Sequence, residues 1–553
     1  MMSSTNTSSV IRKLLQLRGI TSEEDIKEYL SPKPQRTYDP FLMKGMKEAV
    51  KRILYHAERG SRICIYGDYD CDGVTAVFLM TEVLKELTDE HLIDHYLPSR
   101  FREGYGLNKD AIDKIAERKT DLLITVDCGI SQAEEAAYAE SLGIEVIITD
   151  HHNTSDIIPD CIVLDPKQQD CPYPFDSLCG CGVCYKLAQA LQRTAGFDKS
   201  VIHRLLDIAG IATIGDVVPL TDENRTIAKY GLYEIRSGRR ENIRILLDKL
   251  SRGYAELDSY GVSFGIVPCI NAAGRMGDAD NALALLRAEN PEQAEMYASC
   301  LSAANNDRKG VQEEAYKRGI DLIEEQCPDS TIPVIRDDLA HEGIIGIVAG
   351  KLSSKLYRPV IVLTEKDGKV KGSGRSIEEV DLYSIVSAHS DMLERFGGHR
   401  AACGLTLKSA DALDDFRAAL EGEMEMLLEE DPGLLDDDGR YDLIIEPSNV
   451  NLQVAEEIEC MEPFGNANEK PAFKLENVHI SRGFLMGSEK NHLKFRAEKD
   501  GYTVECVAFF AADEYGDLVF KEPVCDIIGR IAVNEFRGRK TAQFVVDRIT
   551  EQV

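Results

Sequence analysis

The stretch YGDYDCDG, residues 66–73, places three carboxylates at alternating positions, Asp68, Asp70 and Asp72. It follows Arg62-Ile-Cys-Ile-Tyr66, a short apolar run with β-branched residues that predicts a buried strand. Carboxylates this close together repel one another, and a buried group of them stays ionised only beside a partner of opposite charge. The stretch therefore predicts a strand that ends in an acidic site for a cation.

From residue 61 to about 220, apolar stretches alternate with helical ones. The predicted strands are Arg62–Gly67, Ile93–Leu97, Asp121–Asp127, Glu145–Asp150 and Cys161–Leu164, and the predicted helices include Gly73–Leu87, Lys109–Arg118 and Gln132–Leu142. Such alternation predicts an α/β fold, with a mostly parallel sheet that helices cover on both faces.

Acidic or histidine side chains stand at the ends of four of the apolar stretches. After the first group, Asp127 ends LLITVDCG, the trio Asp150, His151 and His152 ends EVIITDHH, and Asp216 ends IATIGDVVPL. In an open parallel sheet, ligands bind at the carboxyl ends of the strands. A single acid of this kind is explained as a helix N-cap, but four groups at corresponding ends predict one shared site.

Carboxylates together with an imidazole suit a hard or borderline divalent cation, and we expect Mn²⁺ or Mg²⁺ in preference to zinc. The predicted ligands outnumber those that one ion needs. Two ions about 3.5–4 Å apart would use them, and paired ions are typical of phosphoester hydrolysis. Cys71 and Cys128 adjoin the acids, but the alternating pattern predicts that their side chains point away.

The rest of the chain predicts further parts. The expected parts are an N-terminal helical segment at 1–55, the parallel-sheet domain at 56–224, a helical connector at 225–330, a second α/β domain at 331–435 and a small β-barrel of the oligonucleotide-binding (OB) kind at 441–553. In the second α/β domain, strands at Ile332–Ile335 and Val360–Thr364 flank a helix at Ile344–Leu356.

The tail predicts the barrel through five short strands, at Ala472–Leu475, His492–Arg496, Thr503–Phe510, Cys525–Ile531 and Gln543–Ile549. The chain has no Trp, so any base stacking on the tail would use aromatic residues that suit a barrel core equally well: Phe484, Phe495, Tyr502 and Phe536.

Composition limits the class of protein. The chain has 553 residues, too many for one core, and a formal net charge of −31, which argues against a surface coated for nucleic-acid binding. A nucleic acid would have to be held in a confined, locally positive groove. No signal peptide and no membrane-spanning run is predicted, so we expect a cytoplasmic protein whose fifteen cysteines are reduced.

Four of these cysteines lie close together, at Cys171, Cys179, Cys181 and Cys184. The spacing Cys181-Gly-Val-Cys184 is that of a metal ligand pair, but no second CxxC follows at the distance of a zinc ribbon. Packing of small side chains before a helix is favoured over a zinc site.

The set GDYDCDG, VDCG, TDHH and GDVVPL resembles the DHH phosphoesterase superfamily, whose Asp-His-His motif corresponds to residues 150–152. The resemblance narrows to a branch of single-strand-specific DNA exonucleases, whose motif G-D-x-D-x-D-G-x-T-A matches Gly67–Ala76 at every position. Other matching stretches are Arg100 with Gly104–Leu107, Asn271–Arg275, Gly343–Ala349, Gly372–Ser376 and Gly397–His399. PFGNANEKP at 463–471 departs from the more glycine- and proline-regular pattern of the family.

The resemblance implies a role for each matching residue. The implied metal ligands are Asp70, Asp72, Asp127, His151 and Asp216, with Asp127 between two ions, while Asp68 and His152 lie close to the metals. In the second α/β domain, which the resemblance identifies as DHHA1-like, Ser373, Arg375 and His399 correspond to residues that bind substrate phosphates. Arg275 and Arg308 are expected to contact the backbone of the DNA strand, although a role on a helix surface suits them nearly as well.

The implied activity is stepwise hydrolysis of single-stranded DNA from its 5′ end to 5′-mononucleotides, in DNA repair and recombination. The implied partners are single-stranded DNA, a helicase and a single-stranded-DNA-binding protein, with no membrane, and the protein is expected to be a monomer.

Two alternatives stay open. One is a DHH phosphodiesterase for oligoribonucleotides or cyclic dinucleotides, although such relatives usually carry a histidine where Tyr66 stands. The other is an inactive scaffold that binds single strands, although such a protein would have lost metal ligands that are all present here.

Overall fold

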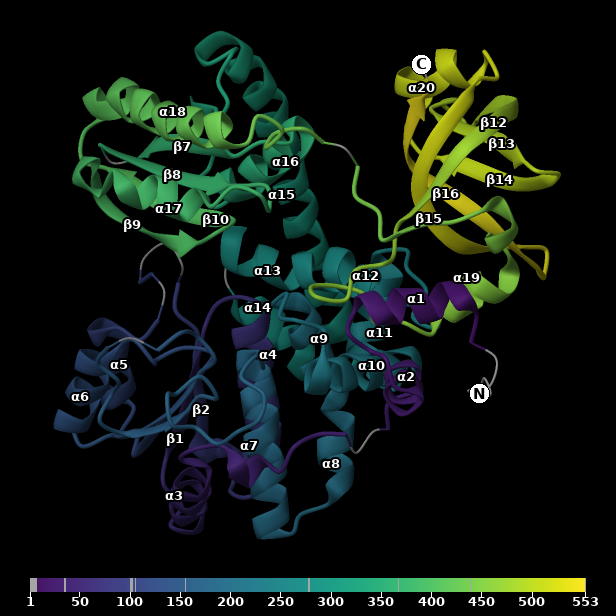
Figure 1. The fold of residues 1–553 in the computed structure, drawn as a ribbon. Helices are drawn as coiled ribbons and strands as arrows, with labels where there is room; N and C mark the ends of the chain where they lie inside the picture. The colour runs from purple at the N-terminus through teal and green to yellow at the C-terminus, as the bar shows by residue number, and fades with distance from the viewer. Residues whose placement is uncertain are drawn as a thin grey trace. The chain divides into compact units, whose positions relative to one another are not determined.

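The computed structural model describes residues 7–33, 36–99, 103–104, 106–154, 156–276, 279–366, 368–437 and 439–552, apart from the side chains of 275 and 276. Within these ranges, no helix combines the length and the apolar character that crossing a membrane requires. The chain divides into two compact units, the first formed by residues 1–274, 278–300 and 439–553 and the second by 275–277 and 301–438 (Figure 1). Each unit is described by itself below.

The first unit contains a parallel five-stranded sheet, as predicted. Its strands are β1 (Ile63–Gly67), β2 (Ile93–Tyr96), β3 (Leu122–Val126), β4 (Glu145–Thr149) and β5 (Ile162–Leu164), in the order β2-β1-β3-β4-β5. Every residue of β1 and β3 is buried. These strands read as continuous apolar runs because helices cover both faces of the sheet.

Helices cover both faces of the sheet. On one side lie α5 (Lys109–Glu117) and α6 (Ala133–Ser141), and on the other α3 (Met46–Glu58), α4 (Cys71–Leu84) and α7 (Gly180–Ala195) (Figure 1). Among these helices, α4 and α7 are buried on nearly every side. Tyr66, which ends the apolar part of β1, is fully buried in the core under α5 and donates a hydrogen bond to the carbonyl oxygen of Gly106 at 2.8 Å.

The prediction that Asp216 ends a strand is wrong. The residues before it form a helix, α9 (Leu206–Gly215), and Asp216 is its C-cap. This helix packs among α4, α7 and α10 (Asp222–Arg236), so it is apolar all round. A short run that is apolar on every side has no helical periodicity, and it cannot be told from a buried strand by pattern alone.

The N-terminal segment and the connector are helical, as predicted. Their other helices are α1 (Ser9–Leu17), α2 (Glu23–Leu30), η1 (Pro40–Leu42), α11 (Glu241–Lys249), α12 (Ser259–Gly261), η3 (Val262–Ile266), α13 (Val267–Met276), α14 (Asp280–Arg287) and α15 (Pro291–Gln326). Two further helices, η2 (Glu90–Leu92) and α8 (Lys199–Arg204), lie between residues 56 and 224.

The second unit is a mixed sheet with helices against it. Its strands are β6 (Val334–Arg336), β7 (Val360–Lys366), β8 (Lys369–Arg375), β9 (Leu393–His399) and β10 (Ala402–Leu407), in the order β6-β7-β8-β10-β9. Its helices are α16 (Ile345–Leu356), α17 (Leu382–Ala388), η4 (Ser390–Met392), η5 (Ala410–Ala412) and α18 (Leu413–Glu430). Only β6 and β7 pair in parallel.

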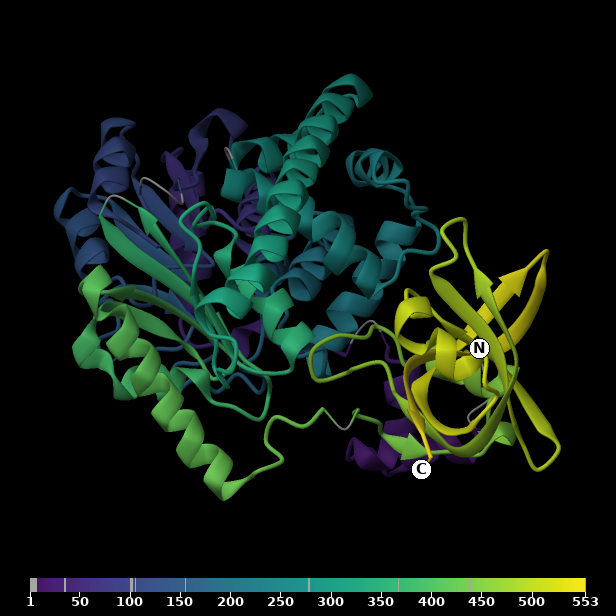
Figure 2. The same ribbon diagram turned by 90° about the horizontal axis from the view of Figure 1, so that it is seen from above.

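The C-terminal residues form the predicted barrel. Its elements are β11 (Leu443–Ile444), η6 (Pro447–Asn449), α19 (Leu452–Glu459), β12 (Phe473–Met486), β13 (His492–Lys499), β14 (Tyr502–Ala508), α20 (Ala512–Val519), β15 (Val524–Phe536) and β16 (Arg539–Glu551). Pairing of β12 with β15 closes a ring of five strands (Figure 2). Phe495 is buried in the barrel core, whereas Phe484, Tyr502 and Phe536 are more than half exposed.

Candidate active site

The turn between β1 and α4 brings the three carboxylates of the opening stretch together. Asp70 is the N-cap of α4, and its Oδ1 accepts hydrogen bonds from the backbone N–H groups of Asp72 at 2.9 Å and Gly73 at 3.1 Å. A β-carbon on Gly73 would lie 2.4 Å from the carbonyl oxygen of Asp68, so only glycine fits there. Asp68 and Asp72 are almost fully buried as a result of this tight turn.

The N-terminus of α7 fixes the carboxylate of Asp72. The backbone N–H of Gly180 donates to Asp72 Oδ2 at 2.6 Å, and that of Cys181 donates to Oδ1 at 2.9 Å. Free N–H groups and the positive end of the helix dipole favour a carboxylate at this position. The two hydrogen bonds therefore hold the carboxylate of Asp72 in one orientation.

Asp127 follows β3 in an unusual backbone conformation. Its φ of +62° is left-handed, which is uncommon for a residue other than glycine, and its N–H donates to the carbonyl oxygen of Thr149 at 3.0 Å. A β-carbon on Gly180 would lie 2.6 Å from Asp127 Oδ1. The strained turn and the missing β-carbon together let this carboxylate enter the centre of the cluster.

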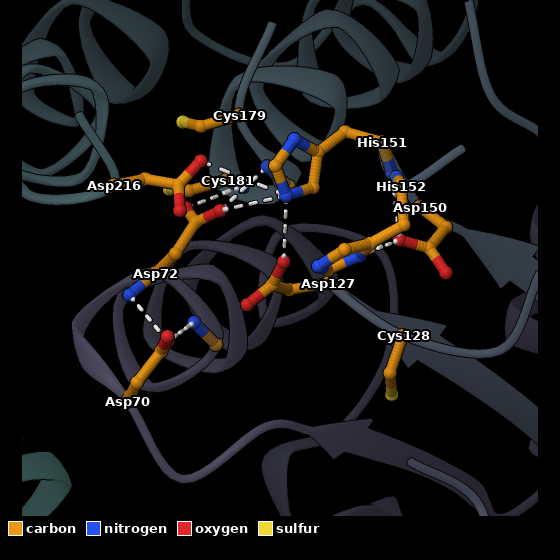
Figure 3. A network of polar contacts seen from close by, with 12 residues as sticks. Asp70, Asp72, Asp127, Cys128, Asp150, His151, His152, Cys179, Cys181 and Asp216 are labelled. Atoms are coloured by element: carbon orange, nitrogen blue, oxygen red, sulfur yellow. Dashed lines mark hydrogen bonds and ion pairs between the residues drawn. The ribbon is translucent and has the colours of Figure 1, made fainter. Parts of the chain in front are cut away.

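His151 lies at the meeting point of three carboxylates (Figure 3). Its Nε2 is 3.2 Å from Asp127 Oδ1, 3.6 Å from Asp216 Oδ2 and 3.9 Å from Asp72 Oδ2. Neither ring nitrogen makes a hydrogen bond to a residue of the described ranges. Burial lowers the pKa of His151 to about 4, so the imidazole is neutral near pH 7 and has a lone pair for a metal.

Asp150 has a different task from the acids around it. Its Oδ1 accepts hydrogen bonds from the N–H groups of His151 at 2.7 Å and His152 at 3.2 Å and lies 2.7 Å from His152 Nδ1, while Oδ2 accepts from the N–H of Ile130 at 2.9 Å. Burial alone would lower the pKa of His152, but the hydrogen bond and charge of Asp150 outweigh it and raise that pKa. Asp150 thus orients the two histidines.

Asp216 completes the cluster from the C-terminus of α9. Its Oδ2 is buried and makes no hydrogen bond to the residues that the structure describes, and the same holds for Asp127 Oδ1. Burial, reinforced by the neighbouring carboxylates, raises the pKa of Asp127 and Asp216 well above the usual range. Buried acids left without a partner in this way are the signature of a site for cations.

The geometry of the cluster fits more than one metal ion. Three groups each offer ligand atoms that lie within 4.8 Å of one another: Asp127 with His151 and His152, Asp72 with His151 and Asp216, and Asp68 with Asp70 and Asp127. Asp127 and His151 each belong to two of the three groups. The structure therefore brings together all seven residues that the sequence predicted for this site.

The sequence did not reveal how backbone groups support the cluster. The N–H donors of α7 are one example, and another is Asn271, whose Oδ1 accepts a hydrogen bond from the N–H of Cys71 at 2.7 Å. Asn271 belongs to the matching stretch NAAGR, which was the signal for it.

Three of the four cysteines near α7 have separate partners. Cys171 Sγ accepts from the N–H of Lys44, Cys179 Sγ caps α7 through the N–H of Gly182, and Cys184 Sγ contacts Thr149 Oγ1 at 3.3 Å. The side chain of Cys128 points away from the cluster of carboxylates and imidazoles, as expected (Figure 3).

In the second unit, Ser373 and Arg375 lie two residues apart on β8 and share one face of the sheet. Arg375 Nη1 donates to Ser373 Oγ at 3.1 Å, and Arg375 forms no ion pair with any described residue. Ala402 of β10 pairs with both Arg375 and His399, which places those two side chains in one row. A β-carbon on Gly346, in the first turn of α16, would lie 2.9 Å from Ser373 Oγ.

The structure says less about Arg275 and Arg308, the two arginines that were expected to contact the DNA backbone. Arg308 lies in α15, is 9% exposed and donates to Asn305 Oδ1 at 2.9 Å and Gln312 Oε1 at 2.9 Å, so its guanidinium is engaged within its own helix. Arg275 lies in α13, but its side chain is outside the described part of the structure, as are Arg100 and Tyr105.

Comparison with known protein families assigns three parts of the chain. Residues 62–214 match the N-terminal domain of the DHH family, residues 329–426 match the DHHA1 domain, and residues 441–548 match the RecJ OB domain. The chain is 37% identical to the single-stranded-DNA-specific exonuclease RecJ of Bacillus subtilis, over 97% of this chain and 67% of that protein. It is 32% identical to RecJ of Escherichia coli, over 98% of this chain and 95% of that protein.

Solved structures of RecJ are also similar to this chain. RecJ of Thermus thermophilus in complex with Mn²⁺ superposes with a TM-score of 0.81 and 27% identity, covering 98% of this chain and 76% of that one. The complex of the same protein with Mg²⁺ gives a TM-score of 0.75 at 25% identity. With three domain matches in the order found in the structure and similarity to relatives along nearly its whole length, the chain belongs to the RecJ family of single-stranded-DNA-specific exonucleases.

Proposed function

We propose that this protein hydrolyses single-stranded DNA in the 5′→3′ direction, releases 5′-mononucleotides, and uses the carboxylate and imidazole cluster at residues 68–216 as its catalytic centre. The observation that carries the proposal is the convergence of Asp72, Asp127 and Asp216 on the neutral ring nitrogen of His151. RecJ proteins named as single-stranded-DNA-specific exonucleases share this chain's domains and most of its length.

The cluster is proposed to hold two divalent cations, Mn²⁺ or Mg²⁺. The ligands would be Asp70, Asp72, Asp127, His151 and Asp216. Asp127 and His151 each belong to two of the three ligand groups, and of the two only the carboxylate has a second oxygen with which to serve both ions, so Asp127 would be the shared ligand. Oxygen ligands with one imidazole suit both metals, and related RecJ structures contain Mn²⁺ and Mg²⁺. When bound, such a pair of cations activates a water and neutralises charge on the phosphate and the leaving oxygen.

The chain's own groups would then orient the substrate. The raised pKa of His152, which Asp150 supports, favours an imidazolium that donates a hydrogen bond to a phosphate oxygen beside the cations. Asp68, buried next to Asp70 and Asp127, would accept a proton or a hydrogen bond at the same edge.

The second unit is proposed to bind the phosphates of the strand. Arg375 has no carboxylate partner among the described residues, and burial lowers its pKa, so a phosphate would supply the missing counter-charge. Ser373 and the N-terminus of α16 at Gly346 offer further donors on the same side. His399, which shares a row with Arg375, together with Arg275 and Arg308, is proposed to contact the same backbone.

Each predicted part would take a share of this work. Residues 56–224 would carry the hydrolysis, 331–435 would hold the strand, and the barrel at 441–553 would bind DNA through its exposed aromatic side chains. A helicase and a single-stranded-DNA-binding protein are the proposed partners in repair and recombination, because this activity needs a strand that has been unwound.

The proposal is tested by Asp127→Ala. We expect nuclease activity in Mn²⁺ on a 5′-ended DNA strand to disappear, while the melting temperature stays near that of the wild type, because Asp127 Oδ1 makes no hydrogen bond in the described structure. Asp121→Ala is the matched control, since Asp121 adjoins the other end of β3 and accepts a hydrogen bond from the N–H of Arg62. Nearly full activity in Asp127→Ala would overturn the proposed centre.

The substrate class is tested by comparing a long 5′-ended DNA strand with a dinucleotide. We expect faster release of nucleotides from the long strand. Tyr66 supports this expectation, because it occupies the position at which small-substrate relatives carry a histidine and is buried in the core. Preference for the dinucleotide would favour a small-substrate phosphodiesterase, and no metal-dependent release from either would favour a scaffold.

A further inference from the structure

The loop at residues 462–468, between α19 and β12, reaches the turn that carries Asp216. The side-chain amide Nδ2 of Asn466 donates a hydrogen bond to the carbonyl oxygen of Val217 at 2.8 Å. The carbonyl oxygen of Asn466 accepts one from the N–H of Leu220 at 2.8 Å. One residue from the C-terminal part of the chain thus holds both ends of the turn that follows Asp216.

This turn needs outside support. Asp216 is the C-cap of α9, and the next residue, Val217, has a φ of +60°. Glycine is usual at this position of a helix end, and a β-branched residue is strained in the left-handed conformation. Strain of this kind persists only where neighbouring groups fix the backbone. The side chain of Val217 is 63% exposed, so apolar packing does little to fix it, and the hydrogen bond from Asn466 remains.

The 462–468 loop is itself firmly held from within. Asn468 is 2% exposed, and its Nδ2 donates to the carbonyl oxygens of Met461 at 3.1 Å and Pro463 at 2.6 Å. Gly465 and Asn468 form a β-bridge across the loop. Asn466 is therefore presented by a braced turn and not by a loose connection.

The loop is also tied to the helices around α9. Ser259 Oγ donates to the carbonyl oxygen of Phe464 at 2.6 Å, and Arg225 Nη1 donates to that of Met461 at 2.9 Å. A β-carbon on Gly465 would lie 2.7 Å from Leu220 Cδ1, which shows how closely loop and turn pack. These contacts fix where the amide of Asn466 can reach.

The carboxylate of Asp216, like that of Asp127, depends on its backbone more than those of Asp70 and Asp72 do. Asp70 and Asp72 are oriented by hydrogen bonds, but Asp216 Oδ2 is buried and accepts none within the described structure. Its position 3.6 Å from His151 Nε2 is consequently set by the end of α9 and by the turn that follows. A shift of Val217 would move this carboxylate directly.

We propose that Asn466 is a positioning residue of the metal centre: by holding the carbonyl group of Val217, it fixes the backbone that presents Asp216 to the cations. The inference rests on the proposed role of Asp216 as a metal ligand. It gives the stretch PFGNANEKP, residues 463–471, a part in the chemistry of the parallel-sheet domain. The barrel segment thereby contributes to the hydrolytic site as well as to DNA binding.

The test is calorimetric titration of the full chain with Mn²⁺, using Asn466→Ala and Asn466→Asp. Both variants keep the backbone bond to Leu220, and the aspartate keeps the size of the side chain but removes the amide donor. We expect the weaker Mn²⁺ site to lose about three- to tenfold in affinity, as the loss of one supporting hydrogen bond implies. Asn491→Ala is the matched control, because the side-chain amide of Asn491 donates to Glu489 within the β12–β13 loop. The Mn²⁺ affinity of this variant should equal that of the wild type.

A second readout separates positioning from general stability. At limiting Mn²⁺, kcat of both Asn466 variants should fall, and excess Mn²⁺ should restore it, whereas a merely structural role would leave the metal dependence unchanged. Mn²⁺ affinities within about twofold of the wild type in both variants would overturn the inference, whatever their melting temperatures. Asp216→Ala distinguishes the two proposals: if it binds Mn²⁺ like the wild type, the proposed ligand set itself is wrong.

Discussion

Two adjacent histidines show how the surroundings of a residue decide its chemistry. His151 is buried without a hydrogen bond to its ring in the described structure, and its pKa falls to about 4. His152 is 2.7 Å from a buried carboxylate, and its pKa rises. One imidazole is thus neutral and suited to a metal, and the other favours the charged form that a phosphate attracts.

At this scale we predict that Asp150→Asn lowers kcat about 10- to 100-fold, as the loss of an orienting partner does in metal sites. The change removes the charge that raises the pKa of His152. A raised pKa keeps the imidazole charged to higher pH, so its loss should move the alkaline limb of the pH–rate profile to lower pH. The measurement is kcat as a function of pH in Mn²⁺.

The control for this variant is Asp198→Asn, which alters an acid that caps the N–H of Ser200 in α8 and lies outside the cluster. The pH–rate profile of the Asp198→Asn variant should match that of the wild type. An unshifted alkaline limb in Asp150→Asn would contradict the role assigned to Asp150.

The identities of the clustered residues were predictable, because charged side chains next to apolar strands are conspicuous in a sequence. Asp70 and Asp127 were found in this way. The division of labour among them was not predictable: Asp150 belongs to the same DHH motif as His151, yet it orients histidines through hydrogen bonds that only coordinates reveal.

At the scale of elements, the N-terminus of α7 is the support on which the site depends. Its first N–H groups hold Asp72, and its first residue has no side chain to exclude Asp127. One helix end therefore serves two carboxylates from different places in the chain, Asp72 in the first turn of α4 and Asp127 after β3. The electrostatic repulsion between the clustered carboxylates is offset in part by the dipole of α7.

We predict that Gly180→Ala reduces nuclease activity at least about 100-fold, because a β-carbon would lie 2.5 Å from Asp127 Cβ and 2.6 Å from its Oδ1, and Asp127 or the helix must then move. Mn²⁺ titration should show weakened binding together with the loss of rate. The measurement pairs a kinetic assay with calorimetry on the same sample.

Gly182→Ala offers a matched control within the same helix. There a new β-carbon would meet its nearest neighbour, Leu178 Cβ, at 3.4 Å, an ordinary contact, so activity should be retained. Equal activity in Gly180→Ala and Gly182→Ala would show that the close approach to Asp127 does not matter.

Elements differ in how far their pattern predicts them. The strands β1, β3 and β4 were placed to within a residue or so because turn signals bound each apolar run. The residues of α9 wrongly predict a strand, because burial on all sides removes the helical periodicity of their apolar positions. The prediction that Asp216 joins the cluster does not depend on this error, since Asp216 reaches the cluster from a helix end as well as it would from a strand end.

At the scale of the whole molecule, metal binding should be linked to protons. Buried Asp127 and Asp216 have raised pKa values, so in the metal-free protein they bind protons at a pH where ordinary aspartates do not. Cations need the ionised form. We predict that Mn²⁺ binding near about pH 7 releases protons, and that its affinity rises with pH, which calorimetry in buffers of different ionisation enthalpy measures directly.

Asp127 and Asp216 also determine whether the stability of the metal-free protein rises or falls with pH. A folded-state pKa above the unfolded value contributes stability that is present at low pH and is lost as pH rises through the folded pKa. The contribution of these acids to the melting temperature of the metal-free protein should therefore fall as pH rises, and Mn²⁺ should reverse the loss. Binding without proton release would contradict the raised pKa values.

The order of domains was also predictable, because the sequence of each domain has its own pattern of strands and turns. The parallel sheet, the second α/β unit and the barrel all appear in the predicted order. Contacts between segments far apart in sequence were not predictable: nothing in the residues of the 462–468 loop indicates that Asn466 meets Val217.

A crystal structure of the protein soaked in Mn²⁺, with the ions located by their anomalous scattering, tests the proposed metal centre directly. We expect two ions, with the carboxylate of Asp127 between them and with Asp70, Asp72, His151 and Asp216 as the other protein ligands. A structure in which Mn²⁺ occupies other residues, or leaves Asp72, His151 and Asp216 without any ion, would contradict the proposed metal centre.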